Sequence, residues 1–293
     1  MKKTFCILGV LAVVLICDCA AGLWGEKYVS SLSNFSFLQA QICNVMLNKD
    51  ADVVIIGGSK ANHSYITERF ASDRITAFNG GIDGTDCYVA LATLKALSSR
   101  KKPSLAILDI ADRQVEISPS KTIDIISFLY GDYRIKGLTP LFDEQLSSAE
   151  KLKLRSNLYR YNKIPETMVA MLRDKNKTAG GYVPLPGQYV GGDFVELHDF
   201  APNEEEVHYL SEIVSFCSDN DIKLVFSISP SCINNLAFNK WLKEFCENKN
   251  VSLINSNNLY WNHLELFHDD MHLNKEGSEL FTEFLLGKLS EDI

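Results

Sequence analysis

The sequence predicts an α/β protein built on a doubly wound parallel sheet of five strands. Apolar runs rich in β-branched residues alternate with segments of helical periodicity over most of the chain after residue 50. Strands separated by helices pair in parallel through right-handed crossovers. With 293 residues, 46% of them hydrophobic, the chain can bury one substantial core, and a second full domain is not required.

The predicted elements follow in order from residue 52. The strands are residues 52–57, 74–78, 105–110, 223–228 and 251–254. Helical patterns cover residues 86–98, 204–219 and 239–248, and a looser one covers residues 28–47. In a sheet of this kind, ligands bind beyond the carboxyl ends of the strands.

In the middle of the chain, about residues 113–202, the alternation of strand and helix patterns is interrupted. This region holds helical patterns at residues 142–161 and 164–175, followed by a glycine-rich stretch at residues 180–187. An insertion of this length after the third strand is expected to form a helical cap that shapes a pocket at the edge of the sheet.

The N-terminus predicts export. Lys2 and Lys3 precede an apolar run from Phe5 to Cys17, which fits a secretory signal better than a bilayer span of about 20 residues. Residues 19–21 offer a cleavage site, but residues 20–24 could extend the run into an anchor that tolerates Asp18. We therefore expect a signal peptide or membrane anchor at residues 1–24, a helical lead-in at 25–50 and the main domain at 51–293, membrane-anchored or periplasmic.

Several classes of partner and cofactor are not expected. The net charge is −8 and no stripe of Lys and Arg with interleaved aromatic residues is present, which argues against nucleic acid. No phosphate-binding loop, dinucleotide fingerprint or His-x-x-x-His pair occurs, so neither a metal nor a cofactor is predicted. Five cysteines follow the N-terminal segment, and their odd number and spacing indicate buried residues rather than a disulfide framework or zinc site: Cys43, Cys87, Cys217, Cys232 and Cys246.

Two segments far apart in the sequence carry residues suited to hydrolysis. Ser59 follows the first predicted strand after two glycines, where a tight turn would expose a nucleophile. His272 and Asp269 lie three residues apart before the last helical pattern, as a base and its orienting acid would. The alternative for Ser59 is a helix N-cap.

Three segments resemble blocks I, II and V of the SGNH/GDSL hydrolases, in the family's order from about residue 52 onward: residues 57–59 (GGS), 79–84 (NGGIDG) and 269–274 (DDMHLN). Residues 56–65 and the N-terminal apolar segment are similar to membrane-associated SGNH proteins of Bacteroides-type bacteria. The resemblance implies a flavodoxin-like SGNH hydrolase fold. It also implies a serine esterase or acyltransferase acting on O-acyl groups, O-acetyl foremost, of cell-surface carbohydrate.

The resemblance also implies roles for single residues. Ser59, His272 and Asp269 would form the catalytic triad, with Asp270 as a competitor of Asp269 that the family's Asp-x-x-His spacing disfavours. The backbone N–H groups of Ser59 and Gly84 would form the oxyanion hole. Four further side chains are expected to line the substrate pocket, with packing as the alternative for His63 and Tyr65: Asn62, His63, Tyr65 and Asn79.

The chain departs from the family at block III, where Ala111 stands in place of an asparagine. Loss of one such donor costs about 3 kcal/mol in the transition state. Either another group substitutes, with Asn62 and Asn79 the nearest candidates, or the enzyme is slow towards simple esters. The missing asparagine supports a second hypothesis, a non-catalytic carbohydrate-binding or assembly protein. A third, a cytoplasmic lipase-like enzyme, conflicts with the N-terminal segment.

Overall fold

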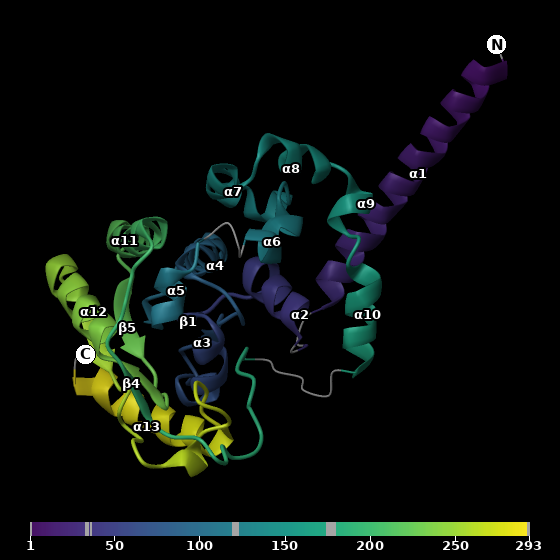
Figure 1. Ribbon diagram of the computed structural model, residues 1–293. Coiled ribbons are helices and arrows are strands. Elements are labelled where there is room, and N and C mark those ends of the chain that lie inside the picture. Colours follow the sequence, from purple (N-terminus) through teal and green to yellow (C-terminus); the bar gives the residue numbers. More distant parts are fainter. Residues whose placement is uncertain (1, 33–34, 36, 119–122, 174–179, 292–293) are drawn as a thin grey trace.

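The computed structural model describes residues 2–32, 35, 37–118, 123–173 and 180–291, and contains the predicted sheet. Five parallel strands lie in the order β2 (Ala77–Asn79), β1 (Val53–Gly57), β3 (Leu105–Asp109), β5 (Lys223–Ile228) and β7 (Ser252–Asn255). The chain passes from β1 outward to β2 and then across β1 to β3, which confirms the doubly wound, flavodoxin-like arrangement. Figure 1 shows the labelled strands β1 and β5 surrounded by helices.

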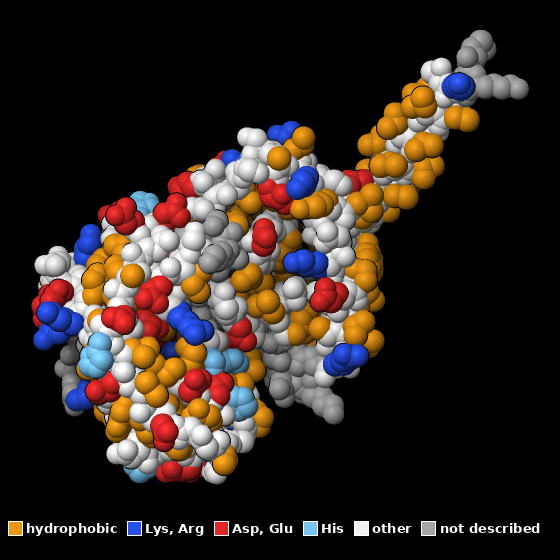
Figure 2. Space-filling model, in the orientation of Figure 1, with side chains coloured by type: hydrophobic (Ala, Val, Ile, Leu, Met, Phe, Trp, Pro, Cys, Tyr) orange, Lys and Arg blue, Asp and Glu red, His pale blue; other side chains and the backbone are white. Residues whose placement is uncertain are grey.

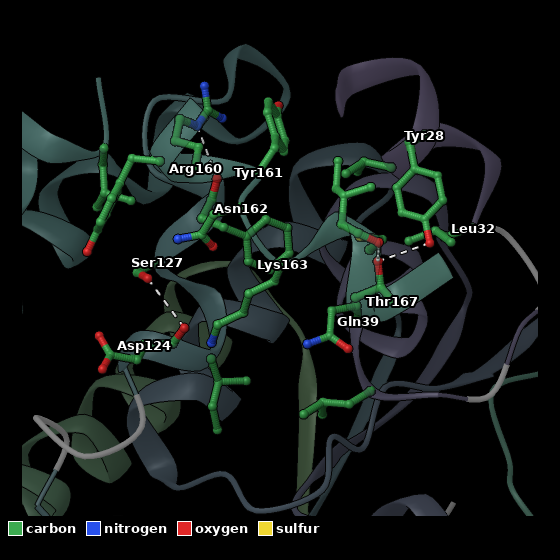
Figure 3. A pocket seen from close by; sticks show the side chains of 18 of the residues that line it. Tyr28, Leu32, Gln39, Asp124, Ser127, Arg160, Tyr161, Asn162, Lys163 and Thr167 are labelled. Atoms are coloured by element: carbon green, nitrogen blue, oxygen red, sulfur yellow. Dashed lines mark hydrogen bonds between the residues drawn. The ribbon is translucent and has the colours of Figure 1, made fainter. Parts of the chain in front are cut away.

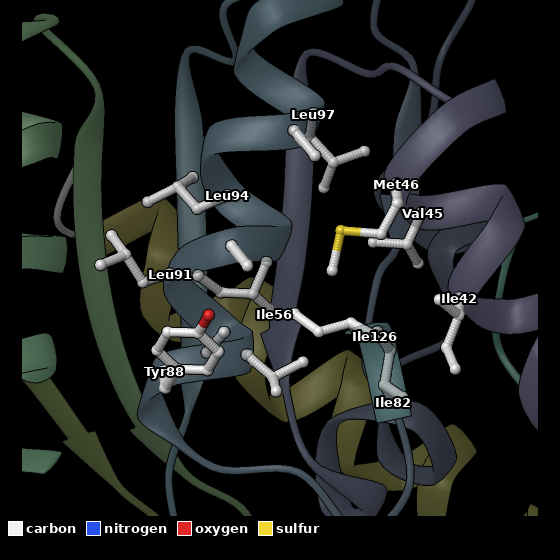
Figure 4. Packing of buried hydrophobic residues seen from close by; sticks show 14 of the residues in the cluster. Ile42, Val45, Met46, Ile56, Ile82, Tyr88, Leu91, Leu94, Leu97 and Ile126 are labelled. Atoms are coloured by element: carbon white, nitrogen blue, oxygen red, sulfur yellow. The ribbon is translucent and has the colours of Figure 1, made fainter. Parts of the chain in front are cut away.

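Helices cover both faces of the sheet, so the central strands are buried on each side. Val54 and Ile56 of β1 pack into a cluster with α4 (Cys87–Arg100), α11 (Glu204–Asp219) and α12 (Leu236–Lys249). Figure 4 shows Ile56 close to Leu91 of α4 within this cluster. Val53 and Ile55 point to the opposite face, towards α3 (Ser59–Ser64) and α13 (Lys275–Glu291), because successive strand side chains alternate.

The second strand is shorter than predicted and begins later. Ser72 and Ile75 form an antiparallel bridge, so the chain is still turning where residues 74–78 were expected to be extended. Thr76 donates from its backbone N–H and its hydroxyl to the Asp52 carboxylate, which fixes the approach to β2.

The predicted helix at residues 142–161 is three short helices in the structure: α7 (Thr139–Gln145), α8 (Ser148–Lys153) and α9 (Asn157–Arg160). Ser147 caps α8 by accepting from the Glu150 N–H, and Ser156 precedes α9. These serines interrupt the helical pattern because they favour caps over helix interiors. The next pattern forms α10 (Ile164–Arg173), and its last two predicted residues lie outside the described part of the chain.

The insertion has a helical part and an extended part. The helical part comprises α5 (Asp112–Glu116), α6 (Ile123–Ile126), η4 (Ser127–Leu129), η5 (Tyr133–Leu138) and α7 to α10. Its elements contact mainly α1, α4 and one another. The extended part, residues 180–189, runs along the carboxyl-end edge of the sheet, and we call it the strap. Further on, β4 (Val195–Leu197) pairs with β6 (Ile233–Asn235) in a small parallel sheet. The sequence did not predict this sheet, because strands of three residues are too short to show a pattern.

The N-terminal segment is one long helix, α1 (Lys2–Ser31), followed by α2 (Leu38–Cys43) and η1 (Asn44–Asn48). It is longer than the predicted apolar run, and by length and composition it could cross a membrane, although a signal sequence near an N-terminus has the same character. Its first half projects from the domain with apolar side chains exposed (Figure 2). Tyr28, Val29 and Leu32 are buried against the domain.

A cavity of about 380 Å³ lies where α1 joins the domain (Figure 3). Tyr28 of α1 and Leu32, directly after α1, line it, and Thr167 of α10 donates to the Tyr28 hydroxyl at its wall. Two short 3-10 helices complete the described elements, η2 (Thr67–Arg69) and η6 (Leu264–Leu266). The five cysteines of the domain are buried and unpaired.

Candidate active site

The turn after β1 places Ser59 at the carboxyl edge of the sheet. Gly57 has φ 142°, and a Cβ there would lie 2.3 Å from the Asp109 carbonyl oxygen, so only glycine fits. Gly58 is the N-cap of α3 and Ser59 is its first residue. The N-cap alternative for Ser59 is therefore wrong, and its hydroxyl instead contacts a histidine.

Ser59, His272 and Asp269 are hydrogen-bonded in series. The Ser59 Oγ lies 2.7 Å from His272 Nε2, across 213 residues of sequence. On the other side of the ring, His272 Nδ1 lies 2.9 Å from Asp269 Oδ1 and 3.0 Å from Oδ2. A carboxylate only accepts, so Nδ1 carries the proton and Nε2 is left to accept the serine proton.

The Asp-x-x-His segment is a turn held by Asp269 itself. Its Oδ1 accepts from the backbone N–H groups of Met271 and His272, each at 2.8 Å. Partial burial acts to raise the pKa of Asp269, but the hydrogen bonds from His272 and Met271 outweigh it and lower the pKa. The backbone carbonyl of Asp270 accepts hydrogen bonds from the Cys232 N–H and the Ser231 hydroxyl. Of the two aspartates, Asp269 is the one whose carboxylate is hydrogen-bonded to the His272 ring.

The loop before α4 brings Gly84 to the same edge. Gly84 is exposed with φ 71°, and nothing lies within 4 Å of the position that its Cβ would take. Ile82 N–H donates to the Gly57 carbonyl at 3.0 Å, which ties this loop to the turn before Ser59. This bond holds the loop that carries Gly84 beside the turn that carries Ser59.

Glu206 of α11 fixes the start of α4 behind this loop. Its Oε2 accepts from the N–H groups of Cys87 and Tyr88, at 3.0 and 3.3 Å. Complete burial, together with the charge of the neighbouring Asp86, raises the pKa of Glu206 to about 9. Glu206 therefore helps to position the Gly84 loop, with its protonated form favoured, and no motif in the sequence pointed to this residue.

Three of the four predicted pocket residues hold the site together. Asn79 donates to the Ala61 and Tyr65 carbonyls and accepts from Gly81 N–H. Tyr65 is fully buried and packs edge-on against Phe281, with ring centroids 5.2 Å apart. Asn62 is also fully buried and donates to Asp83 at 2.7 Å. Packing is thus the role that the structure gives Tyr65, and the amide donors of Asn62 and Asn79 are already used.

His63 is a second histidine beside the triad. Its ring lies edge-on to that of His272, with centroids 5.6 Å apart. Its Nδ1 lies 2.7 Å from the Val183 carbonyl and its Nε2 3.3 Å from Asp83 Oδ1. Burial acts to lower the pKa of His63, but the Asp83 carboxylate and the Val183 carbonyl outweigh it and raise the pKa. Both partners accept only, which favours the imidazolium form.

The strap joins α3 to the segment that carries His272. Val183 N–H donates to the Asn62 carbonyl, and Tyr189 N–H donates to the Phe267 carbonyl. Between them, Asn274 donates from Nδ2 to the Gly187 carbonyl at 2.9 Å. The sequence indicated a cap over this edge, but these contacts come from extended backbone. A strap of this kind leaves no periodic pattern to detect.

The fold and these contacts define an α/β protein with a serine, a histidine and an aspartate linked at one edge of its sheet. No protein-family model and no curated protein matches the chain. Among solved structures, a gut microbial diltiazem-metabolizing enzyme is similar over 82% of this chain and 47% of its own, with 14% identity and a TM-score of 0.41. The chain thus spans about half the length of that enzyme.

Proposed function

We propose that this protein is an SGNH-type serine esterase or acyltransferase that acts on O-acyl groups, O-acetyl foremost, of cell-surface carbohydrate. The observation that carries the proposal is the hydrogen-bonded series from Ser59 through His272 to Asp269. The order of these residues along the chain and their Asp-x-x-His spacing are those of the family that the sequence resembles. The carbohydrate substrate rests on that resemblance.

In the proposed reaction, Ser59 Oγ bonds to the acyl carbon while its proton passes to His272 Nε2. The carbonyl electron pair moves onto oxygen, and backbone N–H groups of Ser59 and Gly84 stabilise the charge. The intermediate collapses, the bond to the sugar oxygen breaks, and His272 returns its proton to that oxygen. Water then attacks the acyl-serine in hydrolysis, or a second hydroxyl attacks it in transfer.

One observation favours a second function, a carbohydrate-binding or assembly protein that does no chemistry. Ala111, at the position of the block III asparagine, has no side-chain donor to offer. The intact series of hydrogen bonds at Ser59 argues against this function, since binding alone does not need an oriented histidine on a serine.

The enzyme is expected to prefer an acylated oligosaccharide over a small activated ester such as p-nitrophenyl acetate. A small ester gains no binding energy from the strap and insertion, whereas a sugar chain can use contacts away from the acyl group to lower the barrier. We expect kcat/KM to be at least about 10-fold higher for the oligosaccharide, which is about 1.4 kcal/mol. Parallel kinetics on the two substrates measure this. Equal values, or a higher value for the small ester, would remove the carbohydrate part of the proposal.

We further propose that α1 is retained as a membrane anchor. The Asp18 carboxylate, in the middle of α1, accepts hydrogen bonds from Ser156 Oγ, Asn157 Nδ2 and Leu158 N–H at the start of α9. Gly25 leaves room for the Tyr161 ring, which would lie 2.3 Å from a Cβ there. Cleavage after Ala21 would remove Asp18 and with it these hydrogen bonds to the start of α9.

The protein should fractionate with membranes of a Gram-negative host and resist alkaline extraction. Deletion of residues 1–22 should release a soluble, folded domain, because Tyr28, Val29 and Leu32 still pack against it. In the full chain, Asp18→Ala should remain in the membrane but lose about 1 kcal/mol of domain stability, as other capping losses do. A mature N-terminus at Gly22 with soluble periplasmic protein would eliminate the anchor while leaving export intact.

A further inference from the structure

The side chain of Gln114 folds back over the position where the family's asparagine is missing. Gln114 lies on α5, three residues after Ala111, and its Oε1 accepts from the Ala111 N–H at 2.9 Å. The backbone N–H of Gln114 donates to the Ala111 carbonyl, and the backbone carbonyl of Gln114 accepts from the Cys87 thiol. The Oε1 contact holds the side-chain amide against Ala111, and the backbone bonds hold the residue that carries it.

The other end of this amide is a donor without a partner. Gln114 is 7% exposed, and among the residues that the structure describes its Nε2 has no hydrogen-bond acceptor. A buried donor left unsatisfied costs about 1–3 kcal/mol, so such a group in a well-packed site calls for an explanation. Asn62 and Asn79, the other amides at this edge, already donate hydrogen bonds to groups within the fold.

The unpartnered nitrogen faces the turn that carries the serine. A Cβ on Gly58 would lie 3.3 Å from Gln114 Nε2 and 3.4 Å from the Thr85 carbonyl oxygen. Gly58 directly precedes Ser59, and Thr85 directly follows Gly84. The nitrogen therefore lies close to the turn that carries Ser59, and the carbonyl next to Gly84 approaches the same side of Gly58.

We propose that Gln114 is a further catalytic residue, whose Nε2 donates a hydrogen bond to the oxyanion of the tetrahedral intermediate. This inference rests on the proposed serine hydrolase function. Gln114 would supply, from one helical turn further on, the side-chain donor that Ala111 lacks. A donor fixed in advance by its Oε1 contact needs no reorganisation as negative charge develops, which is how such groups lower a barrier.

The decisive variant is Gln114→Glu. It keeps an oxygen for the Ala111 N–H, and a glutamate is as suited as a glutamine to this position three residues after a helix N-cap. It replaces the donor with a group that repels the oxyanion when ionised. We expect kcat/KM for p-nitrophenyl acetate to fall about 10²–10³-fold, with the thermal midpoint close to that of the parent. Gln114→Met, which lacks both polar atoms, should lose activity to a similar degree and stability as well.

Gln145→Glu is the matched control. It makes the same change on α7, where Gln145 donates to the Tyr209 hydroxyl, and should keep the parent activity. An active parent with Gln114→Glu within about 2-fold of it would show that Gln114 only caps α5, and would leave the proposed function standing. A folded parent that neither hydrolyses the ester nor reacts with a fluorophosphonate at Ser59 would overturn both proposals together.

Discussion

Ser59→Ala and His272→Ala are each expected to remove nearly all acyl-ester turnover while the protein stays folded. Ser59 supplies the attacking oxygen, and His272, 2.7 Å from it, is placed to take its proton. Members of a triad act as a unit, so each loss should lower kcat by roughly 10⁴-fold or more, and the double variant should be no worse than either single one. Initial rates on one ester substrate measure this.

The two aspartates serve as graded controls. Asp269→Asn should retain more activity than either variant above. The asparagine side-chain oxygen can still accept from the Met271 and His272 N–H groups, but the negative charge beside His272 is lost. Asp270→Asn should be close to the parent, because Asp270 binds Cys232 and Ser231 through its backbone oxygen, which the substitution keeps. Parent-like turnover in Ser59→Ala or His272→Ala would remove the triad from the account.

Glu206→Gln is expected to stabilise the protein increasingly as the pH rises. The pKa of Glu206 is raised to about 9 in the folded state, against a reference value of 4.5, by burial and then by the charge of Asp86. Between these values the unfolded state has released the proton that the folded state keeps, so stability falls with pH, by up to about 1.4 kcal/mol per unit. Glutamine can still accept from the Cys87 and Tyr88 N–H groups without carrying a proton that titrates.

Denaturant unfolding at several pH values from 5 to 9 checks this expectation. The stability difference between Glu206→Gln and the parent should widen between pH 5 and pH 8, by up to about 4 kcal/mol. Glu205→Gln is the matched control, because Glu205 is exposed one residue earlier on α11 and should follow the parent at every pH. If both variants share the parent's pH dependence, Glu206 is ionised in the folded protein and its proposed state is wrong.

The sequence was sufficient to locate the strands of the central sheet and to bring Ser59, His272 and Asp269 together at one edge of it. The strands β1, β3 and β5 are largely apolar runs with a glycine or polar residue at or directly after their ends, so they could be located closely. Ser59 and His272 could be paired because parallel strands deliver their following loops to one edge. These signals are local, and each depends on a few neighbouring residues.

What the sequence could not predict depends on contacts between distant segments. The strap has no periodicity, and its role comes from backbone hydrogen bonds to α3 and to residues near His272. Asn79 was expected in the substrate pocket, yet its side chain donates to the Ala61 carbonyl in α3 and to the Tyr65 carbonyl directly after α3. Gln114 lies in no family block, and only the fold shows that its amide reaches the turn before Ser59.

The central claim, that Ser59 is an activated nucleophile, is tested most directly by reaction with a fluorophosphonate followed by peptide mass spectrometry. We predict one adduct per chain, located on Ser59, formed with the native protein and abolished in His272→Ala, because the serine oxygen needs its base to react. A folded protein that forms no adduct, or that is modified at another serine while Ser59 stays free, would contradict the account and favour a binding protein with the same fold.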